Sequence, residues 1–131
     1  MPGNSRTVQL AFANWLRGTA MPPAPTSLTL ALSTTVIRDD GTSFTEPTTG
    51  YTRQALTLSA PIFTEGAGSV VANSNAIVFG PASASWGTIV SAAVLDQTGA
   101  MLFHGEFAAV RSVPSGDTVS FGIGTLEFNV K

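Results

Sequence analysis

The chain has 131 residues, of which 44% are hydrophobic and only 11% are charged, with a formal net charge of −2 at pH 7. This length suits one domain with its own core, and the lack of cysteine excludes disulfides, thiolate metal sites and thiol nucleophiles. Charge this low, against about 25% in a typical domain, provides no basic surface for nucleic acid or for anionic membranes, and little repulsion between copies.

The first predicted element is a short amphipathic helix that begins after Ser5, a good N-cap, and ends at Gly18. Its apolar residues recur at helical spacing and form one stripe, made of Val8, Ala11, Phe12, Trp15 and Leu16. Residues 21–25 hold three prolines and predict an extended connector. Residues 1–26 are therefore expected to form an arm, whose stripe packs either on its own sheet or on another chain.

Residues 27–131 are expected to form one β-domain. The alternation of Leu28, Leu30 and Leu32 predicts a half-buried strand, and the small apolar segment 88–95 predicts a central strand buried on both faces. Further strands are expected at 52–58, 61–64, 69–72, 76–79, 101–107, 118–123 and 126–130, with a hairpin turn at 73–75. The pattern favours an all-β, antiparallel β-sandwich or jelly-roll-like single domain with one short N-terminal helix.

The residue types and spacings in this sequence do not favour a catalytic function. His104 is the only group suited to proton transfer near neutral pH, and its expected neighbour Glu106 is more typical of a surface hydrogen bond. Residues 39–42 lack the spacing of a calcium loop. We therefore expect no catalytic residue, metal site or cofactor. Trp86 and Tyr51 are possible sugar-stacking rings, although a buried position at one end of the domain is favoured for Trp86.

Two features beyond the helix suggest contacts with other proteins. Segment 34–50 is long for a connection within a domain, which is typical of functional loops. Arg53 lies in an apolar strand, where it needs either a partner, such as one from another subunit, or access to water along its stem. The predicted interface residues are Phe12, Trp15, Arg17, Asp39, Asp40 and Arg53.

Four short motifs, in this order, resemble a family of small virion proteins of tailed bacteriophages. Its members are often labelled tail fibre proteins, and some act as head decoration, or cement, proteins. The motifs are the helix and Pro/Ala connector at 14–34, Gly50-Tyr51-Thr52-Arg53-Gln54, the block from Asn73 to Gly87, and 116–121. The resemblance covers almost the whole chain, while the Thr-rich loop 34–50 departs from the family pattern.

The resemblance implies a structural virion protein and not an enzyme. We expect a capsid decoration protein that stabilises the head by binding the major capsid protein, as a homotrimer on the head exterior, after synthesis in the host cytoplasm. Neither nucleic acid nor a membrane is an expected partner. The short chain, which has no fibrous repeat, favours the head. The alternative is a tail fibre or baseplate component that recognises host surface glycans.

Overall fold

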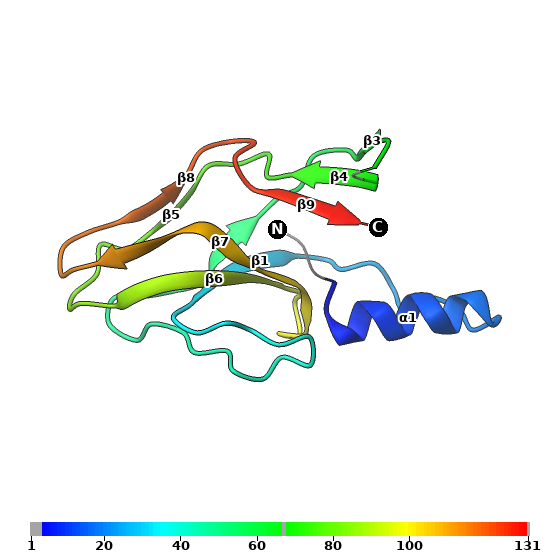
Figure 1. Cartoon of the computed structure of the whole chain (residues 1–131), viewed down its shortest axis with the longest axis horizontal. Coiled ribbons are helices and arrows are strands. Elements are labelled where there is room, and N and C mark those ends of the chain that lie inside the picture. The colour runs from blue at the N-terminus through cyan, green and yellow to red at the C-terminus, as the bar shows by residue number, and fades with distance from the viewer. Residues whose placement is uncertain (1–3, 67, 131) are drawn as a thin grey trace.

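The computed structural model describes residues 4–66 and 68–130 of the chain. Within those residues it contains one α-helix and nine short strands (Figure 1). In chain order they are α1 (Arg6–Leu16), β1 (Leu28–Ser33), β2 (Gln54–Leu56), β3 (Ile62–Thr64), β4 (Gly68–Ala72), β5 (Ile77–Phe79), β6 (Gly87–Leu95), β7 (Met101–Val113), β8 (Val119–Phe121) and β9 (Glu127–Val130). The expected β-rich chain with one short N-terminal helix is confirmed.

The strands form three antiparallel sheets. The largest has the order β2-β1-β6-β7, and the two smaller ones have the orders β3-β4-β9 and β5-β8. Both small sheets lie on the same side of the four-stranded sheet (Figure 1). The antiparallel arrangement is confirmed, whereas a jelly-roll strand order stays a prediction.

The main core lies between the large sheet and the two small ones. Its fully buried side chains come from all three sheets and include Leu30, Leu32, Ile77, Phe79, Ile89, Val94 and Phe128. β6, predicted as a central strand, does lie between β1 and β7 with both faces covered. Burial of each large apolar side chain contributes roughly 1.5–3 kcal/mol, so this core supplies most of the driving force for folding.

A second, smaller core covers the other face of the same sheet. Ala31, Ala93, Leu95 and Met101 project from the strands and are covered by Ile37 and Phe44 of segment 34–50. The half-buried strand predicted for β1 is therefore wrong, because Ala31 and Ser33 are both 0% exposed. Segment 34–50 packs over the face of the large sheet that the alternating sequence of β1 predicted to be exposed to solvent.

The hairpin predicted at residues 73–75 is also wrong. β4 pairs with β3 and β9, and β5 pairs with β8, so the two strands that flank this turn lie in different sheets. Asn73 is buried at this crossing. Its Nδ2 donates to the carbonyl oxygens of Asn75 and Gly122, at 2.8 and 2.9 Å, and its Oδ1 accepts from the amide of Leu126 at 2.9 Å. These bonds turn the chain from one sheet to the next.

Candidate interaction surface

The N-terminal arm is fixed to the β-domain at its first turn. Ser5 caps α1 by accepting a hydrogen bond from the amide of Val8 on Oγ, and its own amide donates to the carbonyl of Leu102 in β7 at 2.9 Å. The amide of Arg6 donates to the carbonyl of Asp39 at 2.7 Å. Two backbone bonds at its start thus set the direction of the helix.

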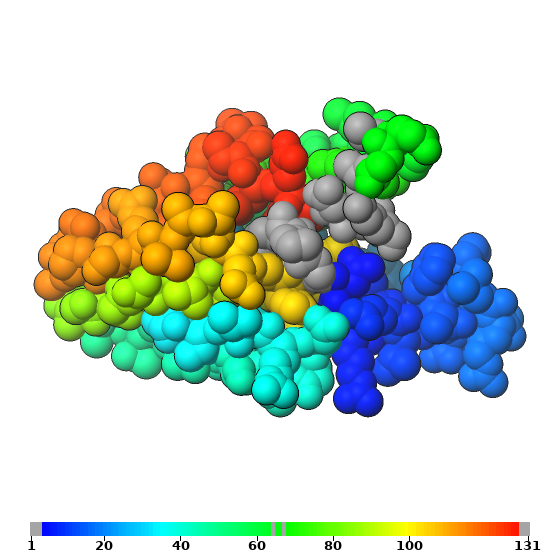
Figure 2. Space-filling model, viewed as in Figure 1, coloured from blue at the N-terminus to red at the C-terminus, as the bar shows by residue number. Residues whose placement is uncertain are grey.

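Beyond this turn the helix leaves the domain with its apolar stripe uncovered. None of its eleven residues is buried, and Phe12, Trp15 and Leu16 are 54, 52 and 67% exposed. Val8 and Ala11 are half-buried, and the rings of Phe12 and Trp15 lie 5.9 Å apart between centroids. The arm projects from one end of the molecule (Figures 1 and 2). An apolar stripe of this kind normally packs against another surface, and the residues that the structure describes leave the outer part of this stripe more than half exposed.

Asp39 ties the helix to the sheet. Its Oδ1 lies 2.6 Å from Nε2 of His104 in β7, and its Oδ2 accepts from Nε2 of Gln9 in α1 at 3.2 Å. The His104 bond, followed by the Gln9 bond, holds the pKa of Asp39 below its ordinary value. His104 thus bonds with a residue from loop 34–50, not with the expected neighbour Glu106.

Asp40, the second predicted interface residue of this loop, stabilises the turn in which it lies. Its Oδ1 accepts from the hydroxyl and the amide of Thr42, at 2.7 and 3.0 Å, which lowers the pKa of Asp40. Across the residues that the structure describes, no three acidic or histidine side chains gather into a possible metal site. The geometry agrees with a turn, as the spacing of residues 39–42 suggested.

Arg53 is paired within its own chain. Its Nε and Nη2 donate to the two carboxylate oxygens of Glu46 at 2.9 and 3.0 Å, a bidentate pair with the far end of loop 34–50. The Tyr51 hydroxyl also donates to Glu46 and accepts from the amide of Leu32 in β1. Both sequence interpretations of Arg53 missed this role, which is to fasten the loop to the sheet.

Replacement of Glu46 with Gln is expected to make the stability of the domain less dependent on acid pH. Burial raises the pKa of Glu46, but the hydrogen bonds from Arg53 and Tyr51 outweigh it, so that the pKa lies below its ordinary value of 4.5. The stabilisation is therefore present above pH 4.5, and it disappears as the pH falls through the lowered pKa. At pH 7 the loss should be about 1 kcal/mol, since Arg53 is 42% exposed and the pair is partly screened.

Urea unfolding at pH 7 and pH 3 measures this effect. The Glu46→Gln variant should be less stable than the parent at pH 7, and the difference between the two should be smaller at pH 3. Glu106→Gln, at an exposed position of β7, serves as the matched control and should leave both values unchanged. An equal loss at the two pH values would show that the carboxylate charge does not hold the loop.

The rings considered for sugar stacking are not exposed. Trp86 is 6% exposed, and its indole N–H donates to the carbonyl of Thr49. The Tyr51 ring is half-buried and lies edge-on to Trp86, with 5.7 Å between centroids. The buried position predicted for Trp86 is confirmed, and neither face of its ring is available for a sugar.

The six predicted interface residues divide into two groups. Asp39, Asp40 and Arg53 line one open cleft of about 280 Å³ beside loop 34–50, where each also bonds within the chain. Phe12, Trp15 and Arg17 lie on the projecting arm, where the Arg17 guanidinium donates to Oδ1 of Asn14 at 3.2 Å and its backbone N–H donates to the carbonyls of Asn14 and Trp15. Both groups are exposed, so all six stay predictions as interface residues, and the arm is the group with large apolar side chains.

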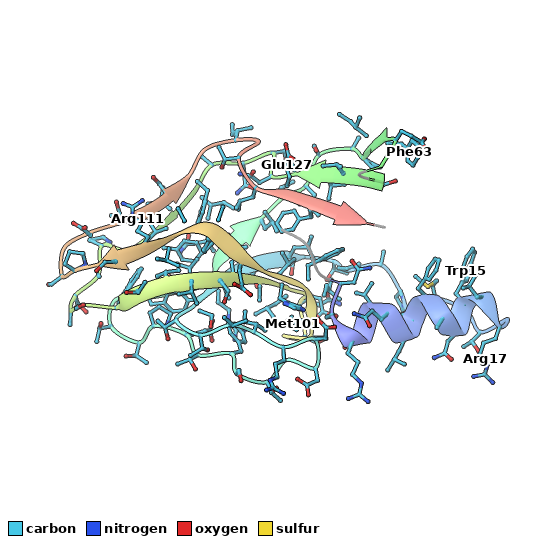
Figure 3. The ribbon with its side chains drawn as sticks, viewed as in Figure 1. Trp15, Arg17, Phe63, Met101, Arg111 and Glu127 are labelled. Atoms are coloured by element: carbon cyan, nitrogen blue, oxygen red, sulfur yellow. The ribbon has the colours of Figure 1, made fainter. Side chains whose placement is uncertain are left out.

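A second exposed apolar site, on β3, was not predicted from the sequence. Ile62 and Phe63 of β3 are 70 and 69% exposed, and Phe63 lies at the same end of the molecule as Trp15 (Figure 3). Adjacent residues of a strand point to opposite faces, so two large apolar residues in succession on an edge strand must place one outward. The succession of Ile62 and Phe63 after Pro61 is the sequence feature from which this exposure could have been predicted.

The sequence comparisons identify one family for this chain. A family model described as "Gp80: Podophage GP4 fiber I protein gp80" matches residues 3–129, almost the full length. No curated protein matches the chain. In the ranges 4–66 and 68–130, no helix has the length and apolar character needed to cross a membrane.

Proposed function

The chain belongs to the Gp80 family of podophage fibre proteins, and from this membership we propose that it is a tail fibre component that acts by binding. As a member it is a structural protein of the phage virion. The family is a fibre family, so the match favours the alternative role over capsid decoration. The major capsid protein as partner and the head exterior as location have no support from the match.

We further propose that the arm is the assembly interface of the protein. The observation that carries this is the exposure of Phe12, Trp15 and Leu16 on a helix whose start is fixed. Large aromatic side chains contribute most to binding when they are buried at the centre of an interface. These side chains are already partly covered, and burial of their remaining apolar surface would favour association by about 25 cal/mol per Å² removed from water.

Replacement of Trp15 with Ser is expected to lower the number of copies in assembled phage particles at least about tenfold, because a central aromatic anchor is lost. Quantitative mass spectrometry of purified particles measures the copy number against another virion protein. Trp15 is half-exposed in the single chain, so folding should be preserved, and a circular dichroism spectrum can verify this.

Leu10→Ser is the matched control for this experiment. Leu10 is 54% exposed, close to the 52% of Trp15, but helical spacing places it on the opposite side of α1. Particles with Leu10→Ser should keep the parental copy number. Equal occupancy for both variants and the parent would refute the arm as the assembly interface.

Recognition of host glycans has weaker support than assembly. The burial of Trp86 and the half-burial of Tyr51 remove the two rings considered for sugar stacking. A glycan array probed with the parent chain tests this role directly. Binding that survives Trp15→Ser would place a sugar site elsewhere than on the arm.

A further inference from the structure

The two ends of the arm are bonded to the hairpin of β6 and β7. At the start of α1 the amide of Ser5 donates to the carbonyl of Leu102, and after the connector the amide of Thr26 donates to Oε1 of Gln97 at 3.1 Å. The helix between these attachments projects from the domain (Figure 1). A helix that is bonded only in its first turn can tilt about that turn, so a further contact is needed to fix its angle.

Gln9 provides this further contact. It lies one helical turn after Ser5, and its Nε2 donates to Oδ2 of Asp39 at 3.2 Å and to the carbonyl of Asn4 at 2.8 Å. Among the hydrogen bonds that the structure describes for residues 7–25, the one to Asp39 is the bond that leaves the arm. It joins the helix to loop 34–50 at a point beyond the first turn, where a bond opposes tilting.

Asp39 is held in place on the side of the β-domain. Its Oδ1 lies 2.6 Å from Nε2 of His104 in β7. Ile37, two residues earlier, is 4% exposed in the smaller core, and the amide of Arg38 donates to the carbonyl of Thr42 at 3.0 Å, which closes the turn around Asp39. The carboxylate therefore connects α1, loop 34–50 and β7, and it offers the helix a fixed point of contact.

We propose that this connection, the Asp39 bridge formed by Gln9, Asp39 and His104, sets the angle of the arm, so that loop 34–50 controls how the arm is presented. Trp15 lies about 15 Å from Ser5 along the helix axis, at a rise of about 1.5 Å per residue, so a tilt of about 20° moves it by about 5 Å. The importance of this angle for assembly rests on the proposed function of the arm, whereas the bridge is a property of the isolated chain.

The distance between two spin labels, measured by double electron–electron resonance, tests the bridge. The parent chain has no cysteine, so Ala13→Cys in α1 and Ala108→Cys in β7, both exposed, provide the two labelling sites. Dilution with unlabelled chain removes distances between copies. The distribution should have a single narrow maximum in the labelled parent, and Asp39→Ala should widen or shift it by about 5 Å, the displacement expected for a tilting helix of this length.

Asp40→Ala is the matched control, since it removes the same charge from the adjacent residue, whose carboxylate accepts from Thr42 within its own turn. Its distance distribution should equal that of the labelled parent. Gln9→Ala removes the other half of the contact and should reproduce the effect of Asp39→Ala. The double variant should be no wider than either single variant, because both break the same contact. Urea unfolding of each variant verifies that the β-domain stays folded.

A parental distribution in both Asp39→Ala and Gln9→Ala, or an equal widening in Asp40→Ala, overturns the inference. Neither result bears on the arm as an assembly interface, which is tested by the copy number of Trp15→Ser in phage particles. A parental copy number for Trp15→Ser would refute the assembly interface, while a widened distribution in Asp39→Ala and Gln9→Ala alone would still support the bridge.

Discussion

Phe79→Ala is expected to lower the free energy of unfolding by about 3–5 kcal/mol, the range for truncation of a buried phenylalanine. Phe79 in β5 is 0% exposed, with its ring parallel to that of Tyr51 at 5.9 Å and edge-on to that of Phe121 at 6.3 Å. Its removal leaves a cavity between the β5-β8 sheet and the large sheet. Urea unfolding, followed by tryptophan fluorescence, measures the change because Trp86 lies in the same core.

The neighbouring residue in the same strand provides the control. Val78 is 50% exposed, so Val78→Ala should change the free energy of unfolding by less than about 1 kcal/mol. Similar losses for the two variants would mean that β5 does not cover the main core with alternate residues. The whole arrangement of small sheets over the large sheet would then need revision.

Asn73→Ala is expected to cost roughly 3 kcal/mol, although Asn73 is a small polar residue. Its amide provides one acceptor and two donor contacts to the backbone of Leu126, Asn75 and Gly122. Alanine leaves the buried amide of Leu126 without that acceptor and removes the donors from two carbonyls. Urea unfolding gives the size of the loss, and hydrogen exchange at the amide of Leu126 reports where it occurs.

Ser74→Ala is the matched variant for Asn73. The Ser74 hydroxyl donates to the carbonyl of Thr57 at 3.2 Å in an exposed position, so its loss should cost less than about 1 kcal/mol. Exchange at Leu126 should be faster only in Asn73→Ala. Unchanged exchange at this amide in both variants would show that the asparagine does not join the two sheets.

The sequence predicted best those helices and strands whose structure depends mainly on their own residues. The stripe of α1 and the small, apolar residues of β6 predicted a helix and a central strand, and both are present. Local Asp, Pro and Gly content likewise accounts for the turns at residues 97–98 and 115–116. Local propensity and periodicity are enough for such elements, since no distant residue needs to be known.

Pairings between distant residues could not be predicted in this way. Two of the three partners of Asn73, Gly122 and Leu126, lie 49 and 53 positions away along the chain, so its sequence neighbours suggested a plain hairpin turn. Asp39 and His104 are separated by 65 positions, and nothing local shows that loop 34–50 returns to β7. The residues predicted the helix but left open whether its stripe packs on its own sheet or on another chain, and only the fold shows that Phe12, Trp15 and Leu16 are exposed.

Loop 34–50 contains a position in the fold where substitutions and insertions are expected to be tolerated. Its two ends are held by Ile37, Phe44 and the Glu46–Arg53 pair, but Asp40, Thr42 and Ser43 at its tip are exposed. Gly41 between them has open space around it, yet its φ of +84° favours glycine. Replacements at the exposed positions of this tip, with Gly41 kept, therefore disturb no buried side chain. An added peptide at this tip is therefore expected to leave the packing of the sheet beneath it unchanged.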